Sequence, residues 1–303
     1  MNNETQLYKK VLVACDFSQH AKAALARAAE IAKVSHAELI VVHCVSDLSI
    51  MPTASEIGGP VYDYFAVQDE LRRDATINLE KFIQENAISG IPLHARVTVG
   101  SPHVAIAEMV DQEKIDLVVT GRSGHSGWEQ FFLGSTSRGL ITRCQCSVLA
   151  TSDELQEQPK SILLCTDFSE SSRVAANEGL LLAKQLGANL HLLHVIDDGD
   201  IPKLMNFSRF DAETMRNSVR EQSEQNLKQF ITSLGTDDWP IFSHVRNGIA
   251  WKEICQCATE IKVDLVIIGN VGRHGLSGLV LGNTADKVLS HSKLSILAVK
   301  HTQ

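Results

Sequence analysis

The stretch Asp116-Leu117-Val118-Val119-Thr120-Gly121 recurs 148 residues later as Asp264-Leu265-Val266-Ile267-Ile268-Gly269. Each copy is a short apolar run, rich in β-branched residues, that ends in glycine. This pattern is typical of a strand that is buried on both faces of a parallel sheet. Because the spacing is about half of the 303-residue chain, the repetition indicates one domain that is present twice.

The repetition extends to both sides of these strands. Cys15-Asp16-Phe17-Ser18 matches Thr166-Asp167-Phe168-Ser169, and residues 39–43 match residues 190–194, at an offset of 151. Both repeats also carry a glycine motif with one spacing. Its residues are Gly121, Gly124, Gly134, Ser135 and Thr136 in the first repeat, and Gly269, Gly272, Gly282, Asn283 and Thr284 in the second.

The boundary between the repeats is visible in the composition. Residues 152–160 are polar, lack periodicity and include Pro159 just before the second copy of the first strand. We expect one domain over residues 1–152, a short linker over 153–160, and a second domain over 161–303.

Strand and helix patterns alternate within each repeat. In the first repeat, apolar runs at 11–14, 39–42, 95–99, 117–120 and 147–150 predict five strands, and Ser18 is placed to cap a helix over residues 21–31. The fold class is therefore α/β, with two Rossmann-like domains that each hold a five-stranded parallel sheet between helices. Ligands of such sheets bind at the carboxyl ends of the strands, where we expect the Asp16 turn to face the Gly121 loop.

Composition limits the class of protein. The apolar fraction is 44%, no apolar run is long enough for a bilayer, and the first residues lack the pattern of a secretory signal. Seven cysteines cannot all pair within one chain, so we expect a cytoplasmic protein without a membrane span. Lys and Arg number 13 against 17 Asp and Glu up to Thr151, and 15 against 19 after it, so each half carries −4. This balance argues against a nucleic-acid partner.

The glycine motif has the chemistry of a phosphate site. A strand that ends in glycine and leads through a second glycine into a helix start exposes backbone N–H groups to anionic oxygens. Glycine leaves room for that approach, and Ser135 and Thr136 add hydroxyl groups. In the second repeat Asn283 replaces Ser135, which keeps the backbone N–H but loses the hydroxyl.

These motifs together resemble the nucleotide-binding branch of the universal stress protein family, in a tandem form that covers essentially the whole chain. The resemblance implies an adenine nucleotide alpha hydrolase-like fold and ATP, AMP or ADP as the ligand, with or without Mg²⁺. It places the ribose and adenine near Asp16 and Asp167, with Cys15 and Thr166 just before them. It places Cys44 and Val195 in the adenine pocket and the glycine motifs at the phosphates. Cys44 and Asn283 depart from the family pattern, so unequal occupancy of the two sites is expected.

The resemblance also implies how the chain associates. Family members often dimerise through the last strand, here residues 148–150 and 296–299, so an intramolecular pseudo-dimer would cover two sheet edges. A further homodimer and protein partners remain open.

The function expected on these grounds is regulation of a stress response through nucleotide occupancy. No P-loop lysine follows the glycines, so catalysis is limited to slow ATP hydrolysis or autophosphorylation on Ser135 or Thr136. The alternative is a nucleotide-independent adaptor, or a protein that binds a hydrophobic ligand, through the apolar segments 48–65 and 201–210.

Other reactive side chains receive structural interpretations. His43 and His194 end apolar strands, where a histidine that bonds to the backbone is commoner than a catalytic base. Cys144-Gln145-Cys146 and Cys255-Gln256-Cys257 lack the spacing of a zinc site. Cys15 and Cys44 flank the expected crevice and are interpreted as buried, inert thiols.

Overall fold

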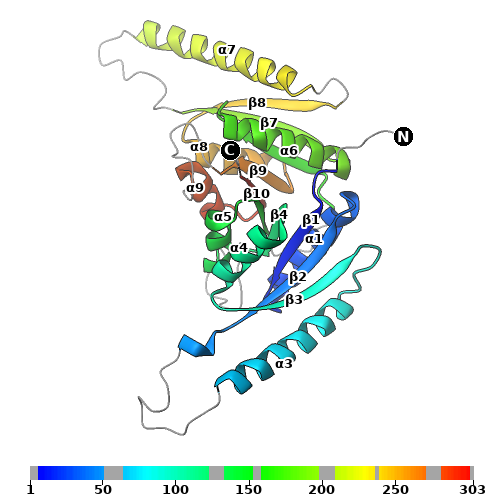
Figure 1. Cartoon of the computed structure of the whole chain (residues 1–303). Helices are drawn as coiled ribbons and strands as arrows, with labels where there is room; N and C mark the ends of the chain where they lie inside the picture. Colours follow the sequence, from blue (N-terminus) through cyan, green and yellow to red (C-terminus); the bar gives the residue numbers. More distant parts are fainter. Residues whose placement is uncertain are drawn as a thin grey trace. The chain divides into compact units, whose positions relative to one another are not determined.

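The computed structural model describes residues 6–50, 64–122, 133–152, 158–197, 209–235, 239–270 and 281–300. The chain divides into two compact units, residues 1–155 and 156–303 (Figure 1). The expected segments after the second strands, and Gly124 and Gly272, lie largely or wholly outside the described residues. No helix in the described part of the chain has the length and apolar character needed to cross a bilayer.

The first unit is an alternation of strands and helices, as predicted. Its elements are β1 (Lys10–Cys15), α1 (Gln19–Val34), β2 (Glu38–Val45), η1 (Leu48–Ile50), α3 (Tyr64–Glu85), β3 (Leu93–Val99), α4 (Pro102–Glu113), β4 (Leu117–Gly121), α5 (Ser135–Arg143) and β5 (Ser147–Thr151).

The second unit repeats this order. Its elements are β6 (Ser161–Thr166), α6 (Glu170–Leu186), β7 (Asn189–Ile196), α7 (Arg209–Ser233), β8 (Ile241–Asn247), α8 (Ala250–Glu260), β9 (Leu265–Gly269), α9 (Asn283–His291) and β10 (Ser295–Val299).

Each unit holds a doubly wound parallel sheet. The strand order is β3-β2-β1-β4-β5 in the first unit and β8-β7-β6-β9-β10 in the second. The chain moves outward from β1 to β3 and then returns to β4, so right-handed crossovers place α1 and α3 on one face and α4 and α5 on the other. The order reverses between β1 and β4, and between β6 and β9, which is where such sheets bind ligands.

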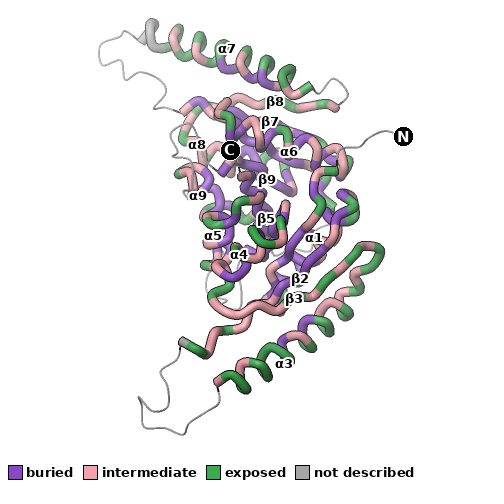
Figure 2. The backbone as a smooth tube through the Cα atoms, in the orientation of Figure 1, coloured by how far each residue is buried: buried purple, intermediate pink, exposed green. Residues whose placement is uncertain are grey.

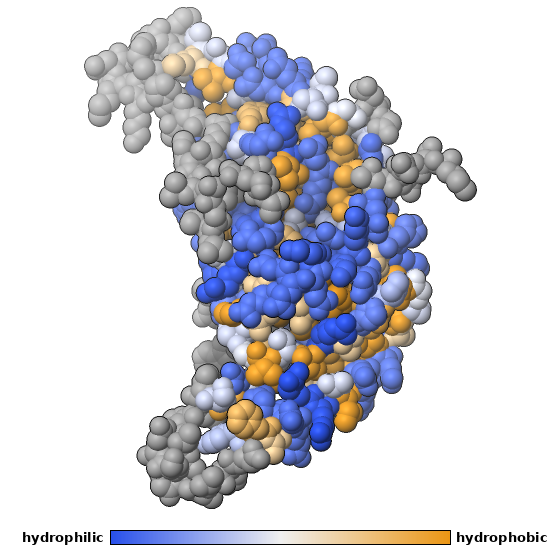
Figure 3. Space-filling model, viewed as in Figure 1, coloured by the Kyte–Doolittle hydropathy of each residue, from blue (hydrophilic) through white to orange (hydrophobic). Residues whose placement is uncertain are grey.

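The core of each unit is the central part of its sheet. In Figure 2 the central strands are almost wholly buried, whereas α3 and α7 are mostly exposed or half-buried. Val11, Leu12 and Val13 of β1 are 0% exposed, because helices cover both faces of the sheet. Figure 3 shows hydrophilic and hydrophobic side chains interspersed on the face turned to the viewer.

A carboxylate fixes the start of the first strand in each repeat. Oδ2 of Asp116, just before β4, accepts hydrogen bonds from the backbone N–H groups of Lys9 at 2.8 Å and Lys10 at 2.9 Å. Asp264 accepts from Lys160 at 2.7 Å and Ser161 at 3.0 Å. The aspartate that opens each repeated stretch therefore has a structural role.

The helix after the first strand is capped identically in both repeats, as predicted for Ser18. Ser18 Oγ accepts from the N–H of Ala21 at 3.1 Å, and Ser169 Oγ accepts from Ser172 at 3.2 Å. In each repeat, the cap fixes the point at which the backbone turns from the end of the first strand into the helix.

We expect Ser18→Ala and Ser169→Ala each to lower the free energy of unfolding by about 1 kcal/mol, because each removes an N-cap acceptor. Urea denaturation measures this. The matched control is Ser101→Ala, since Ser101 precedes α4 without a side-chain cap hydrogen bond. An equal loss in the control variant would contradict the assignment of the effect to capping.

Candidate functional site

The turn after the first strand has the same strained geometry in both repeats. Phe17 and Phe168 each adopt a left-handed backbone with φ of 63°. Asp16 Oδ1 accepts from the backbone N–H of Ser18 at 3.0 Å and from its hydroxyl at 2.5 Å. Asp167 and Ser169 repeat these contacts at 3.0 and 2.5 Å. The aspartate is thus held at the carboxyl end of the central strand.

The strand-end histidines are structural, as expected. His43 Nδ1 lies 2.8 Å from the carbonyl oxygen of Cys15, and His194 Nδ1 lies 2.9 Å from that of Thr166. Their rings also pack against the left-handed phenylalanines, with centroids 4.4 Å apart for Phe17 and 4.3 Å for Phe168. Each histidine therefore ties the second strand to the turn that carries the aspartate.

The first glycine of each motif is required by helix packing. A Cβ on Gly121 would lie 2.8 Å from the Cβ of His20 and 3.0 Å from its carbonyl carbon. In the second repeat a Cβ on Gly269 would lie 2.8 Å from the hydroxyl of Ser171. From the sequence, these glycines were predicted to leave room for phosphate. The structure adds a second reason, close packing against a helix, that does not require a ligand.

The last glycine of the first motif starts a helix. Gly134 is the N-cap of α5, with φ of −59° and ψ of 154°, and no side chain caps this helix start. Its own N–H donates to the carbonyl oxygen of Arg122 at 2.6 Å, which ties α5 to the residue after β4. The N–H groups of the first helical turn, at Ser135, Thr136 and Ser137, therefore point out of the helix without intrahelical partners.

These elements enclose a cleft of about 350 Å³ in the first unit. It contains every residue proposed from the sequence for the first repeat that the structure describes. Its lining consists of Ala14, Cys15, Asp16, Ala21, Val42, His43, Cys44, Pro102, Ile106, Thr120, Gly121, Gly134, Ser135, Thr136 and Ser137. The Asp16 turn and the Gly121 loop thus line one cleft, as expected.

Part of this lining was not predicted. Pro102 and Ile106 come from α4, which carries no motif. Thr120 and Ser137 are buried, with their hydroxyl oxygens 3.3 Å apart, and Ser137 donates to the carbonyl oxygen of Gly121 at 2.6 Å. A comparison of the repeats could have pointed to Thr120 and Ser137, because the second repeat has the apolar residues Ile268 and Ala285 at these positions.

Both thiols of the cleft are protonated near neutral pH. Burial raises the pKa of Cys15 to about 12, and burial also raises the pKa of Cys44 to about 11. The Cys44 thiol donates to the carbonyl oxygen of Gly100 at 3.1 Å. These environments agree with the expectation of inert thiols, because the thiolate is the reactive form.

We expect Cys44 in the folded protein to react with iodoacetamide at pH 8 about a hundredfold more slowly than a thiol of ordinary pKa, because its thiolate fraction is lower by that factor. Peptide mapping after timed alkylation measures the rate, with the protein in urea as the control. Equal rates in the two states would contradict the raised pKa.

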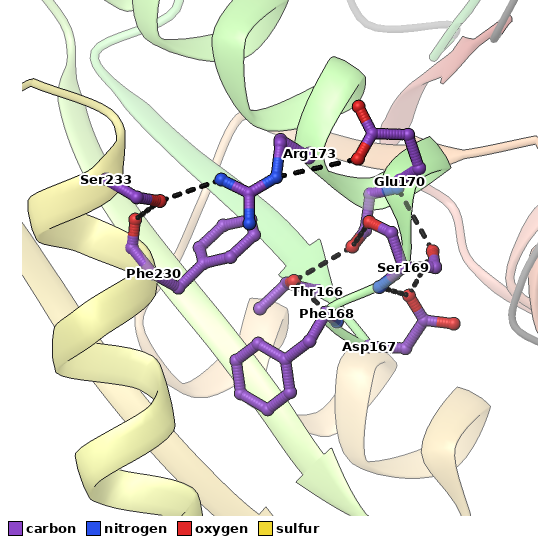
Figure 4. Close-up of polar contacts among 9 residues, drawn as sticks. Thr166, Asp167, Phe168, Ser169, Glu170, Arg173, Phe230 and Ser233 are labelled. Atoms are coloured by element: carbon purple, nitrogen blue, oxygen red, sulfur yellow. Dashed lines mark hydrogen bonds and ion pairs between the residues drawn. The ribbon is translucent and has the colours of Figure 1, made fainter.

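In the second repeat, hydroxyl groups lie around the end of the first strand at two positions where the first repeat has none (Figure 4). Thr166 Oγ1 lies 3.0 Å from Ser172 Oγ and accepts from the N–H of Phe168 at 3.0 Å. The first repeat has Cys15 and Ala21 at the positions of Thr166 and Ser172. The buried hydroxyl pair therefore joins the fourth strand to α5 in the first repeat, whereas it joins the first strand to α6 in the second.

An arginine joins two helices beside this turn in the second repeat. Arg173 lies over the ring of Phe230 at 5.1 Å and donates to Ser233 Oγ at 2.8 Å (Figure 4). Its guanidinium also lies 3.7 Å from a carboxylate oxygen of Glu170. Lys22 stands at the corresponding position of the first repeat. These contacts attach α7 to α6.

The remaining proposed residues of the second repeat occupy equivalent places in their own unit. Gly282 is the N-cap of α9, with φ of −63°, and its N–H donates to Asn270 at 2.8 Å. Asn283 is the first residue of α9, and Val195 lies near the end of β7. Thr284 follows in the first turn of α9, and Gly269 ends β9.

The duplicated doubly wound sheet, with a glycine at the end of the fourth strand in each repeat, defines a tandem α/β protein. The model of the universal stress protein family matches residues 7–152 and 159–300. The chain therefore belongs to the universal stress protein family, and it contains the family domain twice.

Individual relatives agree with this result. A universal stress protein E homolog of Haemophilus influenzae is 27% identical over 306 residues, which is 97% of each chain. Among solved structures, a universal stress protein of Archaeoglobus fulgidus has a TM-score of 0.71 at 19% identity, and covers 98% of this chain and 100% of its own. A putative universal stress protein of Pseudomonas aeruginosa has a TM-score of 0.67 at 20% identity, over 99% and 95%. These two structures support the fold alone.

Proposed function

We propose that the cleft of the first repeat binds ATP or a related adenine nucleotide, and that its occupancy acts as a signal in a stress response. One observation carries the proposal. The cleft brings the Asp16 turn, the end of β2 at Cys44 and the start of α5 to one place at the switch point of the sheet.

The chemistry of the cleft fits both ends of a nucleotide. The uncapped start of α5 and the hydroxyls of Ser135 and Thr136 would hold phosphate oxygens, since a helix N-terminus offers N–H donors and a partial positive charge. Val42 and Cys44 would contact the base, and the Asp16 carboxylate would accept from ribose hydroxyls. The volume of about 350 Å³ lies at the lower end of the range of small-molecule sites.

A magnesium ion fits this site only as a companion of the nucleotide. Asp16 is the one carboxylate among the described residues that line the cleft, and one of its oxygens already accepts from Ser18. Mg²⁺ is commonly bound by one or two carboxylates together with substrate phosphates. Phosphate oxygens and water would therefore supply most of its ligands.

The two repeats should differ in affinity. The second repeat keeps the helix N-terminus and Asp167, but it has Asn283 for Ser135, Ile268 for Thr120 and Ala285 for Ser137. It thus has fewer hydroxyls on the phosphate side. We propose that the first repeat is the principal nucleotide site.

Calorimetric titration of nucleotide-stripped protein with ATP and Mg²⁺ tests the proposal. We expect a stoichiometry near one, and titrations with ADP and AMP rank the contribution of the phosphates. Two equal sites would contradict the difference between repeats. Absence of binding, both in calorimetry and in equilibrium dialysis, would overturn the nucleotide proposal and favour an adaptor role.

A further inference from the structure

Two imidazoles lie side by side on one face of the sheet in the second repeat. His191 of β7 is in register with Phe242 of β8, and Leu193 is in register with His244. Alternate residues of a strand share a face, so His191, Phe242 and His244 all lie on the same side of the sheet. The ring of His191 stacks on both neighbours, with centroids 5.0 Å from Phe242 and 5.3 Å from His244.

The separation of two ring nitrogens is the important quantity. Nδ1 of His191 lies 3.0 Å from Nε2 of His244 in a hydrogen bond in which one ring donates its N–H to the other, and the rings are inclined by 24°. Two imidazole nitrogens bound to one metal at about 2.0–2.1 Å lie about 2.9–3.4 Å apart, for angles between square and tetrahedral. The pair is therefore spaced for two-point coordination, in which an ion would take the place of the proton that the two nitrogens share.

The pair is also accessible. Both histidines are half-buried and Phe242 is 50% exposed, so the pair can be reached from solvent.

The arginine on the same strand as His244 has acidic partners. Arg246 extends from the same strand as His244, and it pairs with Glu260 and, at 3.9 Å, with Glu253, both of α8. These two carboxylates offset the repulsion that Arg246 exerts on a bound cation. The positive charge of Arg246 beside the imidazole pair is thus balanced locally.

We infer that His191 and His244 chelate one divalent transition metal ion, with water completing its coordination. The described residues contain no group of three or more histidine, cysteine, aspartate or glutamate side chains placed around one metal position, so within this part of the chain two ligands come from the protein. Nitrogen ligands of this kind favour Cu²⁺ over Ni²⁺ and Zn²⁺. The site lies on the face of the sheet near β8 and does not use the residues of the proposed nucleotide cleft.

The first repeat provides an internal comparison. Its residues at the positions of His191 and His244 are Ile40 and Arg96, so it has no imidazole pair there. It has His94 at the position of Phe242, and His94 Nε2 lies 3.2 Å from a carboxylate oxygen of Glu38. His94 is therefore a matched single imidazole on the corresponding strand.

Calorimetry with Ni²⁺ tests this inference on the full chain without a polyhistidine tag. Ni²⁺ is used because Cu²⁺ oxidises thiols and all seven cysteines are free. We expect one site, and we expect His191→Gln and His244→Gln each to weaken binding by about a hundredfold, as loss of one of two linked contacts does. His94→Gln should leave the affinity unchanged.

A second measurement locates the ion. Paramagnetic Ni²⁺ should broaden the imidazole proton resonances of His191 and His244 before those of other histidines, and thermal unfolding without metal checks that the variants fold. Equal binding in the wild type and both pair variants would overturn the inference, as would loss of binding in His94→Gln alone. Independent, additive losses in the two pair variants would also contradict chelation.

Discussion

Replacing Gly134 with aspartate is expected to abolish binding of ATP by the first repeat while the protein remains folded. The backbone at Gly134, with φ of −59° and ψ of 154°, is open to any residue, and aspartate is a preferred N-cap. Its carboxylate would accept hydrogen bonds from the N–H groups at the start of α5, which would then no longer be available to phosphate oxygens. It would also oppose the phosphates, and such like-charge contacts cost several kcal/mol, which is more than about a hundredfold in Kd.

The matched control is Gly282→Asp, since Gly282 is the N-cap of α9 with nearly the same backbone angles. Calorimetry should show wild-type affinity for ATP in this variant if the first repeat is the principal site. Thermal unfolding should be unchanged or slightly raised in both variants, because each gains a helix cap. Retention of ATP affinity within about threefold by Gly134→Asp, which is under 1 kcal/mol, would exclude α5 as the phosphate site.

Most of the architecture could be predicted from the sequence, because it depends on local and repeated patterns. The buried strands appear as short β-branched runs, and Ser18 appears as the cap that it forms on α1. Duplication strengthened each prediction, because a pattern such as Asp-Phe-Ser after the first strand occurs twice with the same contacts. The parallel sheet with helices on both faces followed from strand–helix alternation, whereas the order of its strands was first given by the structure.

The parts of the site that were not predicted depend on contacts between distant segments. The start of α4 lines the cleft through Pro102 and Ile106, and neither residue belongs to a recognisable pattern. His191 and His244 are 53 residues apart and occur in only one repeat, so neither spacing nor duplication indicates the pair. Only the register between β7 and β8 brings them together.

Gly121 was also explained only in part from the sequence, because its contact with a distant segment was not visible there. Its motif predicts a backbone that leaves room for phosphate, yet the nearest obstacle to a side chain is His20 at the start of α1. The two reasons make different predictions for the ligand-free protein. If the glycine only admits a ligand, alanine at this position should leave stability nearly unchanged.

We expect Gly121→Ala to lower the free energy of unfolding of the ligand-free protein by about 1–3 kcal/mol, the usual cost of overpacking. The new Cβ would lie 2.8 Å from the Cβ of His20, and 3.0 and 3.1 Å from its carbonyl carbon and oxygen. These atoms move only if α1 moves. The reduced freedom of the unfolded chain offsets only about 0.4–1 kcal/mol of this cost.

Gly269→Ala is the matched comparison, and it should be the milder change. There the closest atom, at 2.8 Å, is the hydroxyl oxygen of Ser171, which can rotate away, and the backbone atoms are at 3.2 Å. Urea denaturation of both variants without nucleotide measures the difference. Equal stability of Gly121→Ala and the wild type would show that α1 can shift without loss of stability. Access for the ligand would then be the only remaining explanation for the glycine. A loss in Gly121→Ala that exceeds the loss in Gly269→Ala would instead show that the cleft is shaped by the packing of the helix start against the strand end before any nucleotide arrives.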